Sequence, residues 1–192
     1  MIAATLSDST LLIDILSASF QDNKSIQYLV KQDAKKETRI RQLMKYSINY
    51  CTEFGKLILS NNKKACALLV YPYKKTTSIR SVLLDLQLVV QVIGISNIRK
   101  AIAREREIKK MHPATPFAYL WFIGVDPAEQ GKGIGSQLLH EIMAEAAEAQ
   151  LPLYLETSTE KNLPWYEKHG FRQYATLNFG YTLYFLRKSP NS

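Results

Sequence analysis

Between Phe117 and Thr157 the sequence is typical of a strand, a turn, a helix and a second strand. Phe117 to Val125 is a continuous apolar run, and Leu153 to Thr157 is another. The segment between them, from about Gly133 to Gln150, has the spacing of an amphipathic helix. This order predicts two parallel strands joined by a right-handed crossover, because parallel neighbours need a long connection. The chain is therefore expected to build a sheet covered by helices.

The rest of the chain supplies further helices and strands. The apolar spacing predicts helices after the capping sequence Ser7-Asp8-Ser9, at Ser25 to Val30, from Ile40 to near Cys51 and at Asn162 to His169. The other strands are expected at Phe54 to Leu59, Ala65 to Tyr71, Phe171 to Thr176 and Tyr181 to Arg187. Residues Ser78 to Met111 look helical, although Leu83 to Ile95 is rich in β-branched residues and a strand there is an alternative. The whole is α+β, a mixed sheet with helices on both faces.

Composition excludes several classes of protein. The chain has 192 residues, 46% hydrophobic and 22% charged, which is ordinary for a globular domain and unlike a disordered chain or a coiled coil. There is no apolar run of ~18 residues and no signal-peptide pattern, so a cytoplasmic protein with no membrane partner is expected. Cys51 and Cys66 are read as buried, reduced thiols. No metal is expected, and surface or capping roles are expected for His112, His140 and His169.

The net charge of +8 is unevenly distributed. Residues 24–64 carry ten Lys/Arg and three Asp/Glu, a balance of +7, whereas residues 126–160 carry one Lys and seven Asp/Glu, a balance of −6. A basic half could attract an anionic partner. The basic residues are scattered and lack interleaved aromatic residues, so no specific nucleic-acid binding is expected.

A glycine-rich turn carries the strongest chemical signal. The sequence Gln130-Gly131-Lys132-Gly133-Ile134-Gly135-Ser136 lies between a strand and the start of a helix. Glycines there let backbone N–H groups approach an anion, the helix dipole favours negative charge, and Lys132 could add a point charge. The Walker motif is absent, and the glycine spacing does not fit the dinucleotide fingerprint. These residues alone leave open a turn that binds nothing.

Two blocks together resemble the GNAT N-acetyltransferases. The first is Gln130-x-x-Gly133-x-Gly135 after Gly124-Val125-Asp126-Pro127, and the second is Leu155 to Ser158 followed by Asn162 to Phe171. The second block and the helical segment before Phe117 are similar to the puromycin N-acetyltransferase branch. The resemblance implies one GNAT domain over residues 1–192, with a central mixed sheet of about six to seven strands and a helical insertion at 78–111 before the main cofactor strand.

The resemblance also implies a site for acetyl-CoA and no metal. The strand ending at Val125 would splay away from the strand at Leu153 to Thr157. Backbone groups of Ile123 and Val125 would then hold the pantetheine and polarise the thioester, and Gly124 would allow a bulge or a close approach. Asn162 would bond the pantetheine or orient a water, or serve as a helix N-cap. The pyrophosphate would lie on N–H groups of Gln130, Gly131, Lys132, Gly133, Ile134, Gly135 and Ser136.

Acyl transfer to an amine needs an acid and a base. Tyr166, four residues before Gly170-Phe171, matches the tyrosine of the family that protonates the leaving thiolate; the alternative is a core aromatic residue. Glu156 at a strand end is the candidate base, acting directly or through water, or else a structural carboxylate. Tyr166 would also contact the cofactor.

The resemblance favours acetylation of a small primary amine of aminoacyl, aromatic or xenobiotic type by a monomer or homodimer. The alternatives are acetylation of protein or peptide amines, and a non-catalytic CoA-binding protein. The insertion is expected to wall the acceptor pocket. Its apolar face of Leu83, Leu86 and Val90 would pack against the sheet, and Tyr119 or Trp121 would line the pocket.

Overall fold

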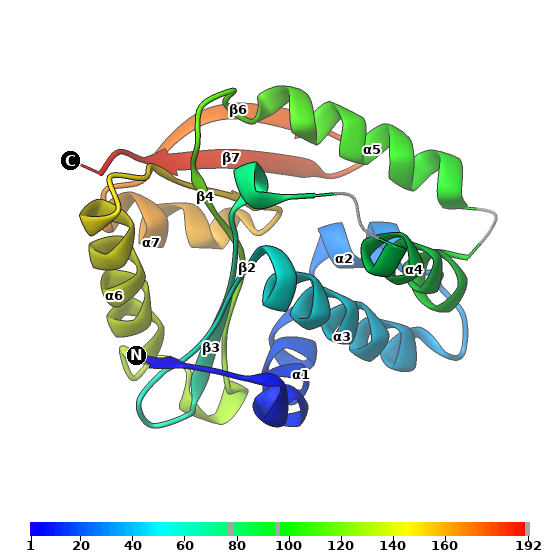
Figure 1. Ribbon diagram of the computed structural model, residues 1–192, viewed down its shortest axis with the longest axis horizontal. Coiled ribbons are helices and arrows are strands. Elements are labelled where there is room, and N and C mark those ends of the chain that lie inside the picture. The colour runs from blue at the N-terminus through cyan, green and yellow to red at the C-terminus, as the bar shows by residue number, and fades with distance from the viewer. Residues whose placement is uncertain (77–78, 95–96, 191–192) are drawn as a thin grey trace.

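The computed structural model describes residues 1–76, 79–94 and 97–190 and shows one mixed sheet between two helical layers (Figure 1). The seven strands lie in the order β1-β2-β3-β4-β5-β7-β6, and only the β4–β5 pair is parallel. This arrangement confirms the predicted crossover. The two-residue strand β1 had no signal in the sequence. The strands are β1 Ile2–Ala3, β2 Gly55–Leu59, β3 Ala65–Val70, β4 Ala118–Val125, β5 Leu153–Thr157, β6 Arg172–Asn178 and β7 Thr182–Lys188.

Helices cover both faces of the sheet, as expected. Helices α1 to α5 lie on one side, and α6 and α7 lie on the other (Figure 1). The described residues contain no helix with the length and apolar character that crossing a bilayer requires. The helices are α1 Ser9–Phe20, α2 Lys24–Leu29, α3 Lys36–Phe54, α4 Ile79–Leu88, α5 Ile98–Met111, α6 Ile134–Glu148 and α7 Leu163–Lys168, joined in places by the 3-10 turns η1 Leu6–Asp8, η2 Pro72–Lys74, η5 Pro127–Glu129 and η6 Glu160–Asn162.

Each face of the sheet has its own core. Helices α1, α2 and α3 pack on one face, around Leu12, Met44 and Ile48, and α6 packs on the other through Leu138 and Ile142. Both cysteines are free and fully buried, as predicted, and burial raises the pKa of each thiol.

The α4 segment is helical, so the alternative of a strand at Leu83 to Ile95 is wrong. The expected packing is also wrong, because Leu83, Leu86 and Val90 are 55%, 57% and 69% exposed. A π-helical turn, Val89–Ile93, follows α4 and shifts the side chains that face inward. Val92 and Ile93 are therefore the buried residues of this segment. Residues 77–78 and 95–96 of the expected insertion lie outside the described residues.

Strand β4 contains a β-bulge that changes which face of the sheet its last side chains point to. Leu69 pairs with Leu120 and Leu68 pairs with Phe122, so Trp121 is an extra residue in the ladder. Leu120 before the bulge and Ile123 after it both pack in the core under α6, whereas Phe122 packs in the opposite core. The bulge thus lies at Trp121 and not at Gly124, where the sequence suggested it.

Candidate active site

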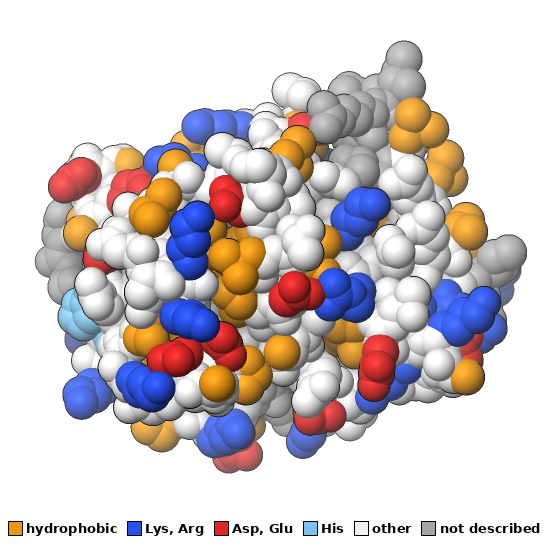
Figure 2. Space-filling model, turned by 90° about the horizontal axis from the view of Figure 1, so that it is seen from below, with side chains coloured by type: hydrophobic (Ala, Val, Ile, Leu, Met, Phe, Trp, Pro, Cys, Tyr) orange, Lys and Arg blue, Asp and Glu red, His pale blue; other side chains and the backbone are white. Residues whose placement is uncertain are grey.

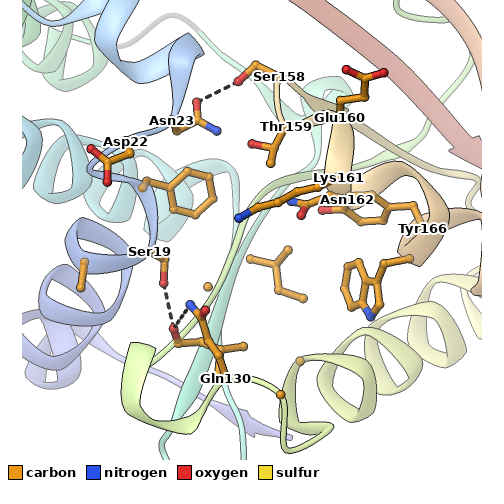
Figure 3. Close-up of a pocket in the computed structure, with 18 of the residues that line it drawn as sticks. Ser19, Asp22, Asn23, Gln130, Ser158, Thr159, Glu160, Lys161, Asn162 and Tyr166 are labelled. Carbon is orange, nitrogen blue, oxygen red and sulfur yellow. Dashed lines mark hydrogen bonds between the residues drawn. The ribbon is translucent and has the colours of Figure 1, made fainter.

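The parallel strands β4 and β5 separate soon after they begin. They pair only at Ala118–Leu153 and Tyr119–Tyr154, and then each continues without the other. This confirms the expected splay. A cavity of about 930 Å³ opens beside the end of β4, large enough for a cofactor of drug size or more (Figure 3).

Four segments form the wall of this cavity. They are the end of α1 with the turn to α2, the end of β4, the glycine-rich turn with the start of α6, and the segment from η6 to α7. Tyr184 and Thr182 of β7 complete it. Most of the residues proposed from the sequence meet here, although their positions span more than forty residues of chain. Those on the wall are Ile123, Gly124, Val125, Gln130, Gly131, Gly133, Ile134, Gly135, Ser136, Asn162 and Tyr166.

The backbone at the end of β4 faces the opening. The N–H of Asp126 donates to the carbonyl of Lys64 beside β3 at 2.8 Å, and alternate residues of an antiparallel strand face alternate sides. The backbone groups of Ile123 and Val125 therefore point away from β3. The Val125 carbonyl already accepts from Ser19 Oγ at 3.0 Å, which leaves its N–H and the groups of Ile123 for a ligand.

Gly124 is required by the contact between β4 and α1. A Cβ at this position would lie 2.9 Å from Ser19 Oγ and 3.2 Å from Leu16 Cδ2. Real Cβ atoms rarely come so close, so a larger residue would push α1 away from β4. The close approach seen at Gly124 is to α1, and its expected role toward the cofactor stays a prediction.

The glycine-rich turn has an open backbone with two glycines in the left-handed region. Gly131 and Gly133 have φ values of 79° and 80°, which glycine adopts at little cost, and no atom lies within 4 Å of a Cβ built on either one. Gly133 is the N-cap of α6, so the first N–H groups of that helix lack carbonyl partners within it. Together these features make a cradle for an anion.

Lys132 differs from its neighbours in the turn. Its side chain is not part of the cavity wall, and its Nζ forms an ion pair with Glu129 Oε2 at 2.9 Å. The charge expected for a phosphate is therefore already balanced by a carboxylate three residues away.

Helix α7 is hydrogen-bonded to this turn, and two of the predicted residues lie at its N-cap and within it. Trp165 Nε1 donates to Ser136 Oγ at 2.9 Å, which joins α7 to the first turn of α6. Asn162 occupies the N-cap position of α7, but its side chain makes no cap hydrogen bond. Tyr166 lies beside Asn162 at the cavity (Figure 3) and is only 6% exposed. Burial raises the pKa of Tyr166, so its phenol stays protonated.

Glu156 lies off the cavity wall, in a cluster that the sequence did not predict. Its Oε1 is 2.8 Å from His112 Nε2, and its Oε2 accepts from the Tyr119 hydroxyl at 2.6 Å. His112 ends α5, so the expected capping position is correct, but its ring is turned inward and is not a surface group. The two residues are 44 positions apart, and no spacing could have connected them.

The remaining side chains of interest fall into other roles. His140 is exposed, and His169 ends α7 with Nδ1 2.7 Å from the Trp165 carbonyl, as surface and capping roles require. Trp121 packs on Tyr50 and Phe122. Neither Trp121 nor Tyr119 is on the wall of this cavity, and their expected place beside the acceptor stays a prediction. Among the described residues no group of three or more His, Cys, Asp or Glu could hold a metal ion.

Charges of both signs are mixed over the surface. Figure 2 shows Lys/Arg and Asp/Glu side chains interspersed on the face seen from below, without a continuous basic patch there. Positive and negative side chains are thus intermingled on this face.

Most of the predicted residues on the cavity wall lie in a segment that is similar to a known protein family. Residues 86–173 match the family model described as an acetyltransferase (GNAT) domain. This segment of the chain, somewhat less than half of it, is similar to GNAT acetyltransferase domains. The matched segment begins in α4 and ends in β6, so it includes β4, the glycine-rich turn, β5 and α7.

Two curated relatives match shorter parts of this chain. An uncharacterized N-acetyltransferase of Schizosaccharomyces pombe is 43% identical over 53 residues, which are 28% of this chain and 22% of that protein. The N-alpha-acetyltransferase RimI of Mycobacterium tuberculosis is 37% identical over 67 residues, 34% of this chain and 42% of that protein. The chain therefore spans less than half the length of these relatives.

Solved structures share the whole GNAT fold. A structure described as histone acetyltransferase HPA2 and related acetyltransferase from Corynebacterium glutamicum superposes with a TM-score of 0.71 at 20% identity, covering 98% of this chain and 94% of that one. Arylalkylamine N-acetyltransferase 2 from Aedes aegypti gives 0.65 at 14% identity, covering 99% and 98%. At this level of identity the likeness concerns the fold alone.

Proposed function

We propose that the protein is an acetyl-CoA-dependent N-acetyltransferase that acts on a small primary amine. The observation that carries the proposal is the shared cavity. It brings together outward-facing backbone groups of β4, the open glycine turn at the start of α6, and the buried phenol of Tyr166. The GNAT domain match supports the same reaction. The resemblance to the puromycin branch, the monomeric or homodimeric state and the cytoplasmic location stay predictions.

The residues present fit the cofactor. Ile123 and Val125 would bond the pantetheine through their backbone, and Asn162, whose amide makes no cap bond, would bond it from the opposite wall. The turn from Gln130 to Ser136 would hold the diphosphate on backbone N–H groups, for which Gly131 and Gly133 leave open space. When bound, acetyl-CoA supplies the acetyl group as a thioester.

The acid and the base of the reaction come from different strands and helices. Tyr166 would donate its phenolic proton to the leaving sulfur, since burial keeps the phenol neutral. Glu156 would take the proton of the amine through water, with His112 and Tyr119 fixing its two oxygens. Because the Glu156 side chain is 8% exposed and lies off the cavity wall, a relay fits better than direct contact.

Glu156→Gln tests the base. Glutamine keeps the shape and can still accept from Tyr119 and donate to His112, but it cannot take a proton. We expect the low-pH limb of kcat/KM to disappear and the folded state to persist by circular dichroism. An unchanged pH profile in this variant would assign the base to another group.

Next to Lys24 and Thr182 of the cavity wall, side-chain contacts join α2 to the β6–β7 hairpin. Arg104 of α5 donates to the Tyr181 hydroxyl beside β7 and to Ser25 Oγ in α2. The rings of Tyr28 and Tyr181 also meet, with centroids 5.5 Å apart. These contacts bridge α2 and the β6–β7 hairpin, so an extended peptide has little room to cross there. This supports a small acceptor.

Acetylation of a protein or peptide amine is the second candidate, because RimI is named an N-alpha-acetyltransferase. A competition assay separates the two. One sample of enzyme receives labelled acetyl-CoA and equal concentrations of an aromatic amine, a polyamine and a histone-like peptide. We expect the aromatic amine to carry most of the label. If the peptide carries most of it, the second candidate replaces the first.

A further inference from the structure

Lys161 is a cation on the cavity wall that the glycine-rich motif does not include. It belongs to η6, the turn before α7, and its side chain extends from η6 into the cavity (Figure 3). Its amino group forms no ion pair with any residue that the structure describes. This sets it apart from Lys132, whose charge is balanced by Glu129.

Helix α7, which follows η6 directly, is fastened to the turn that would hold phosphate. Trp165, four residues after Lys161, donates to Ser136 in the first turn of α6 at 2.9 Å. The wall that carries Lys161 is therefore fastened to the start of α6. Lys24, the other lysine on the cavity wall, begins α2, whose preceding turn is linked to Ser158 through Asn23. Unlike Lys161, it belongs to the α1–α2 segment and not to the segment that Trp165 fastens to the start of α6.

A polyanion in this cavity would be stabilised by a cationic side chain that offsets the carboxylates on the wall. Besides the balanced Glu129, the wall carries the carboxylates of Asp22 and Glu160, which would repel a diphosphate. Backbone N–H groups and the helix dipole offer partial charges only. A lysine ammonium adds a full positive charge and charge-assisted hydrogen bonds.

We propose that Lys161 binds the diphosphate of coenzyme A and is the principal cationic side chain for it. The inference rests on the proposed function, because it assumes that the cavity takes this cofactor. In this proposal the Lys161 ammonium binds the diphosphate from η6, and the glycine-rich turn binds it through backbone N–H groups. Lys132 stays paired with Glu129 outside the cavity.

Titration calorimetry with coenzyme A, 3′-dephospho-coenzyme A and pantetheine tests this role. We expect Lys161→Ala to raise the Kd for coenzyme A about tenfold, the value of one charge-assisted hydrogen bond. The same loss is expected with 3′-dephospho-coenzyme A, which keeps the diphosphate. Pantetheine, which has no phosphate, should bind the wild type and the variant equally, and Lys161→Arg should retain most of the affinity.

Lys168→Ala is the matched control. Lys168 ends α7 and lies off this cavity, so its removal lowers the net charge equally without touching the site. An equal loss in both variants would overturn the proposal in favour of a general charge effect. A loss that disappears with 3′-dephospho-coenzyme A would also overturn it. If the wild type does not bind coenzyme A, the proposed function itself fails, whereas tight binding that is unchanged in Lys161→Ala refutes only the role of Lys161.

Discussion

Tyr166→Phe is expected to lower kcat by roughly 10- to 10³-fold, the usual contribution of a positioned general acid. The ring would keep its packing beside Trp165 and Phe171, because only the hydroxyl is removed. The KM for acetyl-CoA should change little, since the lost interaction acts in the transition state. Steady-state kinetics with acetyl-CoA varied at saturating amine measures both constants.

The pH dependence gives an independent check on the same residue. Burial raises the pKa of Tyr166, so the acid stays protonated throughout the working range. The wild-type kcat should therefore show no falling limb from Tyr166 below about pH 10, the ordinary value of a phenol. Tyr174→Phe is the matched control, because its hydroxyl donates to the Met111 carbonyl away from the cavity. A Tyr166→Phe enzyme with wild-type kcat would mean that the thiolate leaves without this proton.

Gly133→Val is expected to abolish acetyl-CoA binding, raising Kd by about 100-fold or more. The figure corresponds to losing two charge-assisted hydrogen bonds where the side chain fills the cradle. No protein atom lies within 4 Å of the added Cβ, so the clash is with the cofactor and not with the fold. Calorimetry measures the affinity, and circular dichroism should stay native.

The positive φ of Gly133 adds a backbone cost that needs its own control. A non-glycine residue at φ 80° costs roughly 1–2 kcal/mol of stability. Gly180 has φ 84°, equally open surroundings and a place in the β6–β7 turn away from the cavity wall. Gly180→Val should show a similar loss of stability and an unchanged Kd for acetyl-CoA. Unaltered affinity in Gly133→Val would remove the turn from the cofactor site.

The sequence predicted the elements that depend on local pattern. The crossover from β4 through α6 to β5 follows from two apolar runs and one amphipathic stretch, and the structure confirms it. The turn between them was predicted because glycines at positive φ are a local requirement. Asn162 at the end of η6 and Tyr166 on α7 belong to one contiguous motif, so both lie on the cavity wall.

The sequence pattern gave a wrong prediction of the buried face where the regular helical period ends. The apolar stripe of Leu83, Leu86 and Val90 suggested a buried face, but the π-helical turn after α4 rotated Val92 and Ile93 inward instead. Periodicity records which residues share a face of a regular helix. It does not record where the helical period changes.

The charges of the site were decided by tertiary structure. Lys132 lies within the motif but is paired with Glu129 only three residues away, whereas Lys161 from η6 and Lys24 from α2 reach the cavity wall through the fold. Likewise His112 meets Glu156 only because α5 ends beside β5. The sequence alone determined the strand order around the crossover, the glycine turn and the motif on α7, since each depends on contiguous residues. The tertiary structure decided which ionisable groups are balanced and which face the cavity, because electrostatic interactions act through space between residues far apart in the chain.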